Sequence, residues 1–464
     1  MRTGTLSSIE SRWLPVLFLM AGLALADDQV EDGGLDDLLS GFETEDSGFD
    51  DVVIEQPVEP DKTWRFSADI NLISTYGYAR SEPAPGNTDY GKWAQLRIKV
   101  RPEFWFQISD DWDAKISGSA FYDFAYKVVG KEAFANPILN DSENEAEFRD
   151  TYLQGKLASN LDIKLGRQIV VWGKSDNLRV VDVINPLDNR EPGQVDIEDL
   201  RLPLNMARFD YYVDKWNLSA LAIYEVRFDK NPVWGSDYYP ATTPLPPEHV
   251  PGDGGSNSEY ALALNGRMQG WDISFHLARL WDDRAHLSTE NYQPILLHSR
   301  LNMAGVAANI VAGNWLYKAE LAALDGLEFS VLPKEEFSRF DLMLGVEYSG
   351  FDNTTLSLES LVRHVNDWQK QLVTDPLPAQ ENLYQTAFRY NADFFHSRLN
   401  TVLLVMRFGS DLDDGGFTRL QFKYELRDAL SLTLGSVVYH GGNQVPFEMI
   451  SDNDRLFLDL KYSF

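Results

Sequence analysis

The sequence predicts an all-β protein: a transmembrane antiparallel β-barrel of about eighteen strands, with a disordered acidic N-terminal arm. Three observations carry this prediction. Apolar and polar residues alternate along segments of Thr63 to Phe464, tight turns alternate with long polar connections, and the chain ends in an aromatic residue. A strand between lipid and water needs this period of two, because successive side chains point to opposite faces of a sheet. The chain therefore divides into a signal peptide, residues 1–26, an acidic arm, residues 27–62, and a barrel, residues 63–464.

Length, charge and cysteine count exclude several classes of protein. The chain has 464 residues, whereas a single soluble core stops growing at roughly 250 to 300 residues. One closed barrel accommodates this length without a conventional core, because its outer face is buried in lipid. No stretch after the N-terminal segment approaches the roughly 18 apolar residues of a spanning helix. The formal charge of −30 argues against a nucleic-acid partner, and the absence of cysteine excludes disulfides, thiolate metal sites and cysteine nucleophiles.

The N-terminus has the three parts of a secretory signal peptide. Arg2 and Arg12 precede an apolar run, and the run ends in Ala24-Leu25-Ala26. We expect cleavage after Ala26. The alternative is an uncleaved membrane anchor, but an apolar core of about 13 residues is short for spanning a bilayer. An exported chain without cysteine fits the envelope of a Gram-negative bacterium, in the periplasm or in the outer membrane.

The acidic arm carries 14 acidic residues against one Lys, so self-repulsion is expected to keep most of it extended. One short stretch has helical spacing, with apolar residues at i, i+3, i+4 and i+7. These residues are Leu35, Leu38, Leu39 and Phe42. They form either a docking motif for a periplasmic or inner-membrane transport partner, or an incidental apolar patch in a solvated tail.

Connection lengths favour a barrel over a soluble β-protein, because outer-membrane barrels alternate short periplasmic turns with long outer loops. Eight tight turns are predicted at Ser109 to Asp111, Ala158 to Asn160, Asp214 to Lys215, Gln269 to Gly270, Ala312 to Asn314, Gly350 to Asp352, His396 to Ser397 and Asp428. Nine longer polar connections are predicted at 77–91, 127–145, 173–203, 229–258, 282–298, 325–338, 366–382, 409–415 and 441–453. A sixteen-strand barrel is the alternative, because alternation is poor in Leu383 to Phe395.

The C-terminal strand gives an independent indication. Leu458, Leu460, Tyr462 and Phe464 alternate with polar residues. Outer-membrane barrel chains characteristically end in this way, and the similarity implies that Tyr462 and Phe464 are an assembly signal for the barrel-assembly machinery. The alternative is an ordinary edge strand of a soluble sandwich. Six tryptophans are predicted near strand ends, where an aromatic girdle belongs: Trp64, Trp93, Trp112, Trp216, Trp271 and Trp315.

A barrel of this size has a lumen wide enough for water, and strand parity predicts which charges line it. On one strand the inward residues include Arg97, Lys99, Arg101 and Glu103, and on a late strand they include Arg419, Lys423, Glu425 and Arg427. The acidic connection 173–203 is the expected constriction, and a basic wall opposite it would create a transverse field. The alternative is that these charges only solvate the lumen. The net negative barrel disfavours polyanions, which leaves cations and neutral or amphiphilic solutes.

One segment is more specific than a pore requires. It contains Leu165-Gly-Arg-Gln-Ile-Val-Val-Trp-Gly-Lys, Val180-Val-Asp-Val-Ile-Asn-Pro-Leu-Asp and Leu202-Pro-Leu. Here the sequence resembles the bacterial outer-membrane family DUF1302, whose members look like porins, and it is less similar to alginate-export and sugar porins. The resemblance implies an outer-membrane component of a lipid-handling system, working with an inner-membrane RND-type exporter and a periplasmic carrier.

Two residues of this segment are expected to hold the constriction in place. Arg167 and Gln168 lie at a strand end, from which hydrogen bonds to Asp182 or Asp188 would anchor the inward-folded connection. We favour this structural role over contact with a substrate.

No pattern in the sequence indicates an enzyme. There is no Gly-x-Ser-x-Gly motif, and the seven histidines have no metal-ligand spacing. No catalytic residue, metal or cofactor is therefore predicted. The sequence favours an outer-membrane channel for small solutes in contact with membrane lipid. The alternative is the outer-membrane component of a hydrophobic-molecule transport system.

Overall fold

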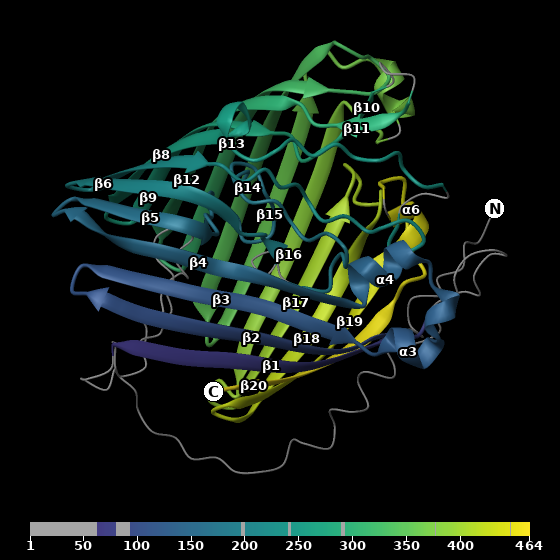
Figure 1. Ribbon diagram of the computed structural model, residues 1–464, viewed down its shortest axis with the longest axis horizontal. Coiled ribbons are helices and arrows are strands. Elements are labelled where there is room, and N and C mark those ends of the chain that lie inside the picture. Colours follow the sequence, from purple (N-terminus) through teal and green to yellow (C-terminus); the bar gives the residue numbers. More distant parts are fainter. Residues whose placement is uncertain are drawn as a thin grey trace. The chain divides into compact units, whose positions relative to one another are not determined.

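In the part of the chain that the structure describes, eighteen antiparallel strands form one closed sheet, the barrel (Figure 1). A computed structural model describes residues 63–79, 93–195, 200–239, 243–288, 293–375, 377–445 and 447–464. The last strand pairs with the first, which removes every sheet edge. This arrangement confirms the predicted fold class. The signal peptide and the acidic arm, with Leu35, Leu38, Leu39 and Phe42, lie outside the described residues.

The strands follow one another around the barrel in chain order. They are β1 (Trp64–Gly77), β2 (Trp93–Ser109), β3 (Trp112–Asp123), β4 (Asn144–Ala158), β5 (Leu161–Gln168), β6 (Leu204–Val213), β7 (Trp216–Ile223), β8 (Glu259–Met268), β9 (Trp271–Trp281), β12 (Arg300–Ala312), β13 (Trp315–Glu328), β14 (Glu336–Phe351), β15 (Thr354–Val365), β16 (Asn382–Phe394), β17 (Leu399–Phe408), β18 (Gly416–Arg427), β19 (Leu430–His440) and β20 (Arg455–Ser463). All eight predicted tight turns join neighbouring strands of this sequence.

Strand β16 decides between sixteen and eighteen strands. It pairs along its length with β15 and with β17. Its alternation is poor in sequence because Thr386 lies between Tyr384 and Phe388 on the outer face, while Ala387 is fully buried on the inner face. A small apolar residue inside and a polar residue outside weaken the contrast between the two faces, although both strand partners are present.

The outer surface carries the large exposed apolar side chains. Along β2, Ile98 and Phe104 on the outer face are exposed, whereas Arg97 on the inner face is half-buried. Each of the six tryptophans predicted near strand ends is the first residue of a strand. The outer face is therefore suited to contact with lipid, with indole rings near its border.

The long connections contain short helices and one small sheet. The β3–β4 connection contains α3 (Ala125–Val129), η1 (Lys131–Ala133) and α4 (Asn136–Ser142). In the other described connections lie η2 (Gly255–Asn257), a two-stranded sheet of β10 (His286–Ser288) and β11 (Ile295–Leu297), η3 (Lys370–Thr374) and α6 (Phe447–Ile450). Among the described residues, no helix has the length and apolar character to cross a membrane.

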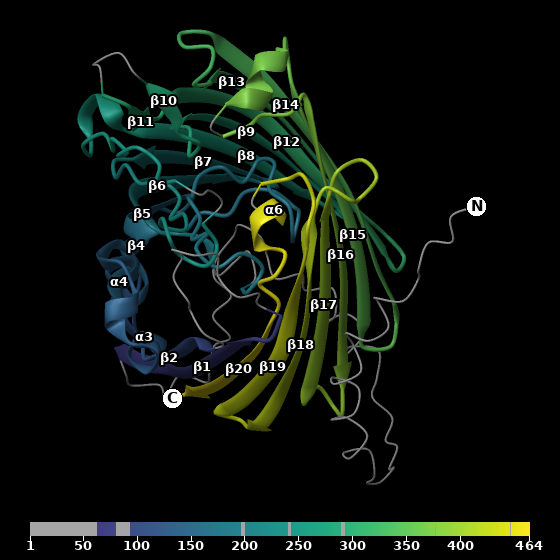
Figure 2. The ribbon, with the colours of Figure 1, turned by 90° about the vertical axis from the view of Figure 1, so that its right-hand side faces the viewer.

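An apolar core fills part of the barrel interior, so the expectation of a barrel without a conventional core is wrong. The connection between β5 and β6 contributes Val170, Trp172 and Val181 to this core. Wall residues such as Ala307 and Met343 pack against it and have no exposed surface. The reason is that the connection runs inside the space that the strands enclose (Figure 2), and these apolar residues lie on it.

Candidate functional site: the loop inside the barrel

The connection 169–203, here called the inner loop, reaches several parts of the barrel wall. Near its beginning it contacts β13 and β15, through backbone amides that meet Glu320 and Glu359. Further along it contacts β2 through Glu191 and β19 through Pro192. Strands β2 and β19 are separated from β13 and β15 by several strands in either direction around the barrel. The inner loop therefore crosses the lumen, as Figure 2 shows.

Two buried carboxylates hold the first part of the inner loop. Glu320 on β13 accepts hydrogen bonds from the backbone amides of Lys174, Ser175 and Val181. Glu359 on β15 accepts bonds from the Asp176 amide at 3.0 Å and the Asn177 amide at 3.1 Å, and from the Ser175 hydroxyl at 2.8 Å. Hydrogen bonds to a carboxylate are about twice as strong as those between neutral groups.

These two carboxylates were missed in the sequence. Both occupy inward positions of strands and have almost no exposed surface. The available signal was a charged residue at an inward position between small or apolar ones, as in Glu320 before Leu321 and Ala322. Lys318, on the same face of β13, forms an ion pair with Asp176 of the inner loop and lies 3.5 Å from Glu347.

Two glycines of the DUF1302-like segment are required by close approach. Gly166 has φ +127°, and a Cβ atom there would lie 2.4 Å from the carbonyl oxygen of Thr151 on β4. Gly173 has φ +96°, and its Cβ would lie 2.7 Å from the Glu320 carboxylate. A residue with a side chain is strained at such φ values and would also collide with these neighbours. The motif thus allows the strand and the loop to pack closely.

The polar motif residues tie the two ends of the inner loop together. Asn185 has no exposed surface; its Oδ1 accepts a bond from the Val170 amide, and its Nδ2 donates to the Leu202 carbonyl, both at 2.8 Å. Asp182 is paired with Arg201 at 3.0 Å and with Arg179 at 3.2 Å. The inner loop is therefore a folded unit with its own internal frame.

The far part of the inner loop is attached to the opposite wall. Arg97 on β2 pairs with Glu191 at 2.8 Å and with Asp123 at 3.3 Å. The Tyr439 hydroxyl donates to the Pro192 carbonyl at 2.6 Å. Burial raises the pKa of Glu191, but the charge of Arg97 outweighs it and lowers the pKa below the ordinary value. The ion pair is therefore present at neutral pH.

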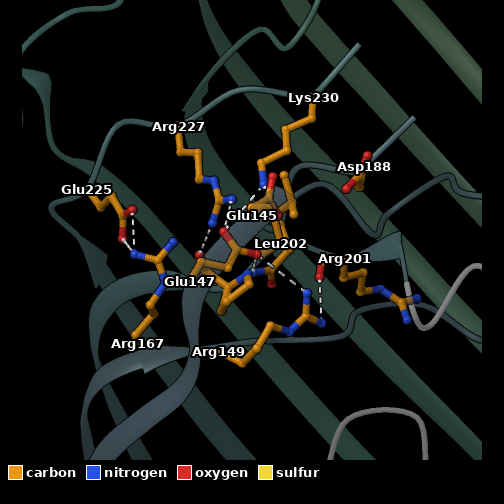
Figure 3. A network of polar contacts seen from close by, with 12 residues as sticks. Glu145, Glu147, Arg149, Arg167, Asp188, Arg201, Leu202, Glu225, Arg227 and Lys230 are labelled. Carbon is orange, nitrogen blue, oxygen red and sulfur yellow. Dashed lines mark hydrogen bonds and ion pairs between the residues drawn. The ribbon is translucent and has the colours of Figure 1, made fainter. Parts of the chain in front are cut away.

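Strand β4 carries a second group of charges that face the connection between β7 and β8 (Figure 3). Glu147 pairs with Arg227 at 2.8 Å, and Glu145 pairs with Lys230 at 2.9 Å. Arg149 donates to the Arg201 carbonyl of the inner loop at 3.2 Å. Charges of both signs thus lie on one wall, each near an opposite charge or a carbonyl.

The predicted anchor by Arg167 and Gln168 is wrong in its partners. Arg167 pairs with Glu225 at 2.9 Å, beyond β7 (Figure 3). Gln168 is fully buried, and its side-chain amide donates to backbone carbonyls, including that of Met206. Asp182 and Asp188 are occupied by arginines of the inner loop itself, Asp188 by Arg190 at 2.5 Å. The arginines that reach these two carboxylates, Arg179, Arg190 and Arg201, belong to the inner loop itself, whereas Arg167 on β5 reaches Glu225.

The remaining predicted lumen residues lie on two strands, β2 and β18. Lys99 and Arg101 are half-buried on β2, and Glu103 pairs with Lys115 at 3.1 Å. On β18, Arg419 is buried and bonds to Gln421. Lys423 and Glu425 pair with each other at 3.0 Å, and Arg427 ends the strand. At the C-terminus, the rings of Tyr462 and Phe464 stack with centroids 5.8 Å apart.

Outside the strands, two half-buried carboxyl groups, Asp229 and Asp283, have raised pKa values. Burial raises the pKa of Asp283 well above its ordinary value, and nearby Asp229 raises it further. Burial also raises the pKa of Asp229, although its carboxylate accepts hydrogen bonds from the Leu187 amide and the Asn189 side chain. Both acids lie beyond the loop-bearing ends of the strands, next to the inner loop.

The family comparison matches nearly the whole barrel. The family model described as "Protein of unknown function (DUF1302)" matches residues 58–464. The chain belongs to the DUF1302 family. This confirms the resemblance drawn from the Gly-Arg-Gln, Trp-Gly and Asn-Pro-Leu-Asp motifs. No curated protein sequence matches this DUF1302 chain at significant similarity.

Solved structures share the fold at low sequence identity. Pseudomonas aeruginosa OccK9 (OpdG) is 13% identical with a TM-score of 0.52, and Acinetobacter baumannii OccAB2 is 10% identical with a TM-score of 0.50. Pseudomonas aeruginosa OccK2 (OpdF), solved in complex with glucuronate, is 12% identical with a TM-score of 0.50. Each comparison covers 86% of this chain and 98% of the other. The DUF1302 protein therefore has the same barrel fold as these proteins.

Proposed function

We propose that this DUF1302 protein is a non-enzymatic channel that passes small polar solutes across the outer membrane. The observation that carries the proposal is the inner loop, which crosses the lumen and is tied to walls on both sides. Such a loop narrows a wide barrel to a passage of defined chemistry while the barrel wall stays intact. The porin fold of the neighbouring structures supports the same conclusion.

The charges beside the passage favour solutes that carry both a positive and a negative group, or a strong dipole. Glu147 with Arg227 and Arg167 with Glu225 present both signs within one network (Figure 3). A fixed pair of opposite charges orients a dipolar solute, whereas it gives little net attraction to a polyanion. OccK2, which has the same fold, is described in complex with glucuronate, and this supports a small hydrophilic solute.

Single-channel recording in planar lipid bilayers tests the proposal. The full-length protein is expected to give discrete ohmic conductance steps in 1 M salt. At this salt concentration the Debye length is about 3 Å, so exposed charges are largely screened. A barrel that is folded yet silent in this assay would contradict an open channel.

A silent barrel would instead favour a second candidate, the outer-membrane component of a hydrophobic-molecule transport system. The helical spacing of Leu35, Leu38, Leu39 and Phe42 in an acidic arm is the observation that favours it. The arm would dock an inner-membrane RND-type exporter or a periplasmic carrier. Co-purification of such a partner, lost on deletion of residues 27–62, is the result that this candidate requires.

We also propose that the chain is exported and cleaved after Ala26, and that Tyr462 and Phe464 direct its assembly. The basic, apolar and small-residue parts of the N-terminus support the first step. The mass of the mature protein, isolated from outer membranes, tests the cleavage site. The amount of folded barrel recovered when Phe464 is deleted tests the second step.

A further inference from the structure

The outer wall of the barrel has a trough near the loop-bearing ends of strands β7 to β14. It has a volume of about 920 Å³, within the range of small-molecule sites. Residues on neighbouring strands form an apolar row across it. In strand order this row consists of Ala220, Leu262, Leu277, Ala304, Ala323 and Phe340.

The trough arises because two adjacent strands carry alanine where their neighbours carry large side chains. Ala304 on β12 lies directly opposite Ala323 on β13. Leu277 stands on one side with 57% of its surface exposed, and Phe340 stands on the other with 40%. Neighbouring strands are about 4.8 Å apart, so these walls are separated by about 14 Å. The floor between them consists of methyl groups.

The trough is closed toward the turn-bearing end of the barrel. One step nearer the turns, the outward-facing residues of the same strands are large, among them Val306 opposite Leu321. Phe275 and Leu342 continue this row on either side. The apolar hollow therefore has a defined end within the lipid-facing band and opens toward the loops.

At its open end the trough is bordered by a polar row with an unpaired cation. In strand order the row consists of Tyr260, Arg279, Asn302, Asp325 and Ser338. Arg279 is exposed, and it forms no hydrogen bond or ion pair with any residue that the structure describes. Asp325 is the acid in this row, and Asn302 on the strand between separates it from Arg279.

We propose that this trough binds an anionic lipid of the surrounding membrane leaflet. One acyl chain lies over Ala304 and Ala323, and the phosphate of the head group contacts Arg279. Charge complementarity favours this occupant, because a guanidinium binds phosphate through paired hydrogen bonds and is costly to leave unpaired at a lipid border. The site faces away from the lumen, so the inference is independent of whether the barrel conducts solutes.

Lipid binding to the purified full-length protein tests the proposal. Native mass spectrometry in detergent would measure retention of dipalmitoyl phosphatidylglycerol, with dipalmitoyl phosphatidylcholine as the uncharged-head-group comparison. Arg279→Gln removes the cation, and the double variant Ala304→Leu, Ala323→Leu fills the floor. Matched controls are Ala319→Leu, an exposed position on β13 outside the trough, and Arg398→Gln, exposed in a tight turn.

We expect one phosphatidylglycerol molecule to remain bound to the wild type and to both controls. Loss of a charge-assisted contact predicts about tenfold weaker binding in Arg279→Gln, and the filled trough predicts a loss at least as large. The two lipids binding equally well would overturn the role of the cation. Equal retention by all variants would show only a non-specific lipid shell and would overturn the site. Far-UV circular dichroism checks that every variant has the barrel content of the wild type.

Discussion

At the scale of single residues, the carboxyl groups in and around the inner loop differ in how many hydrogen bonds they accept. Glu320 and Glu359 are buried but accept several amide and hydroxyl hydrogen bonds. Asp283 lies near other acids, and no hydrogen bond to its side chain is found among the described residues. The first two stabilise the loop through these bonds, whereas burial raises the pKa of the third.

Glu320→Gln is expected to loosen the first part of the inner loop. The Gln side chain keeps the shape of Glu320, but it replaces one of the two acceptor oxygens with an NH2 group that cannot accept from the backbone amides. Weakening these bonds is expected to cost about 1–3 kcal/mol of unfolding free energy. In bilayers the variant should show larger and noisier conductance steps than the wild type. Glu336→Gln, exposed at the start of β14, is the matched control, and equal behaviour of the two variants would contradict the tether.

Asp283→Asn is expected to stabilise the protein at neutral pH. Burial and the nearby Asp229 hold the pKa of Asp283 above its ordinary value. The folded state therefore binds this proton more tightly than the unfolded state, and the wild type gains stability as the pH falls from neutral toward the ordinary pKa of about 3.9. The advantage of the variant should shrink over the same range. Urea unfolding in detergent at several pH values measures it, with Asp428→Asn in a tight turn as the control.

At the scale of elements, strands and turns could be predicted because their cause is local. The period of two and the short turns depend on neighbouring residues, and every tight turn joins the strands expected. The inner loop depends on distant contacts. Nothing near Glu320 or Glu359 in sequence reveals that amides about 140 to 180 positions away meet them. The same limit produced the wrong partner for Arg167, because Glu225 lies beyond two further strands.

Gly166→Ala tests whether the family motif is a packing requirement. The new Cβ would lie 2.4 Å from the Thr151 carbonyl oxygen, and φ +127° is itself strained for alanine. We expect a loss of about 1–3 kcal/mol or more and less folded barrel. Gly313→Ala is the control for a positive φ without a collision, since Gly313 has φ +62° and no atom within 4 Å of the added carbon. Similar losses in the two variants would mean that close packing at Gly166 is not the reason for the motif.

At the scale of the whole molecule, the net charge says little about the passage. The chain has a formal charge of −30, yet the charges beside the inner loop are arranged as pairs. Ion selectivity should therefore respond to the loss of one partner rather than to overall charge. Arg97 and Arg167 are the two predicted lumen residues whose partners are clearest, Glu191 with Asp123 for the first and Glu225 for the second.

Arg97→Ala and Arg167→Ala are each expected to make the channel more selective for cations, because each leaves carboxylates without their cation. The effect of Arg97→Ala should disappear in acid. The pKa of Glu191 is lowered in the wild type by Arg97, so the ion pair persists above the ordinary carboxyl pKa of about 4.3 and is lost as the pH falls below it. Reversal potentials across a bilayer with a salt gradient measure this, with Arg398→Gln as the control for charge alone. If both variants keep the wild-type selectivity, neither arginine faces the conducting passage, and the solute path must lie elsewhere in the barrel.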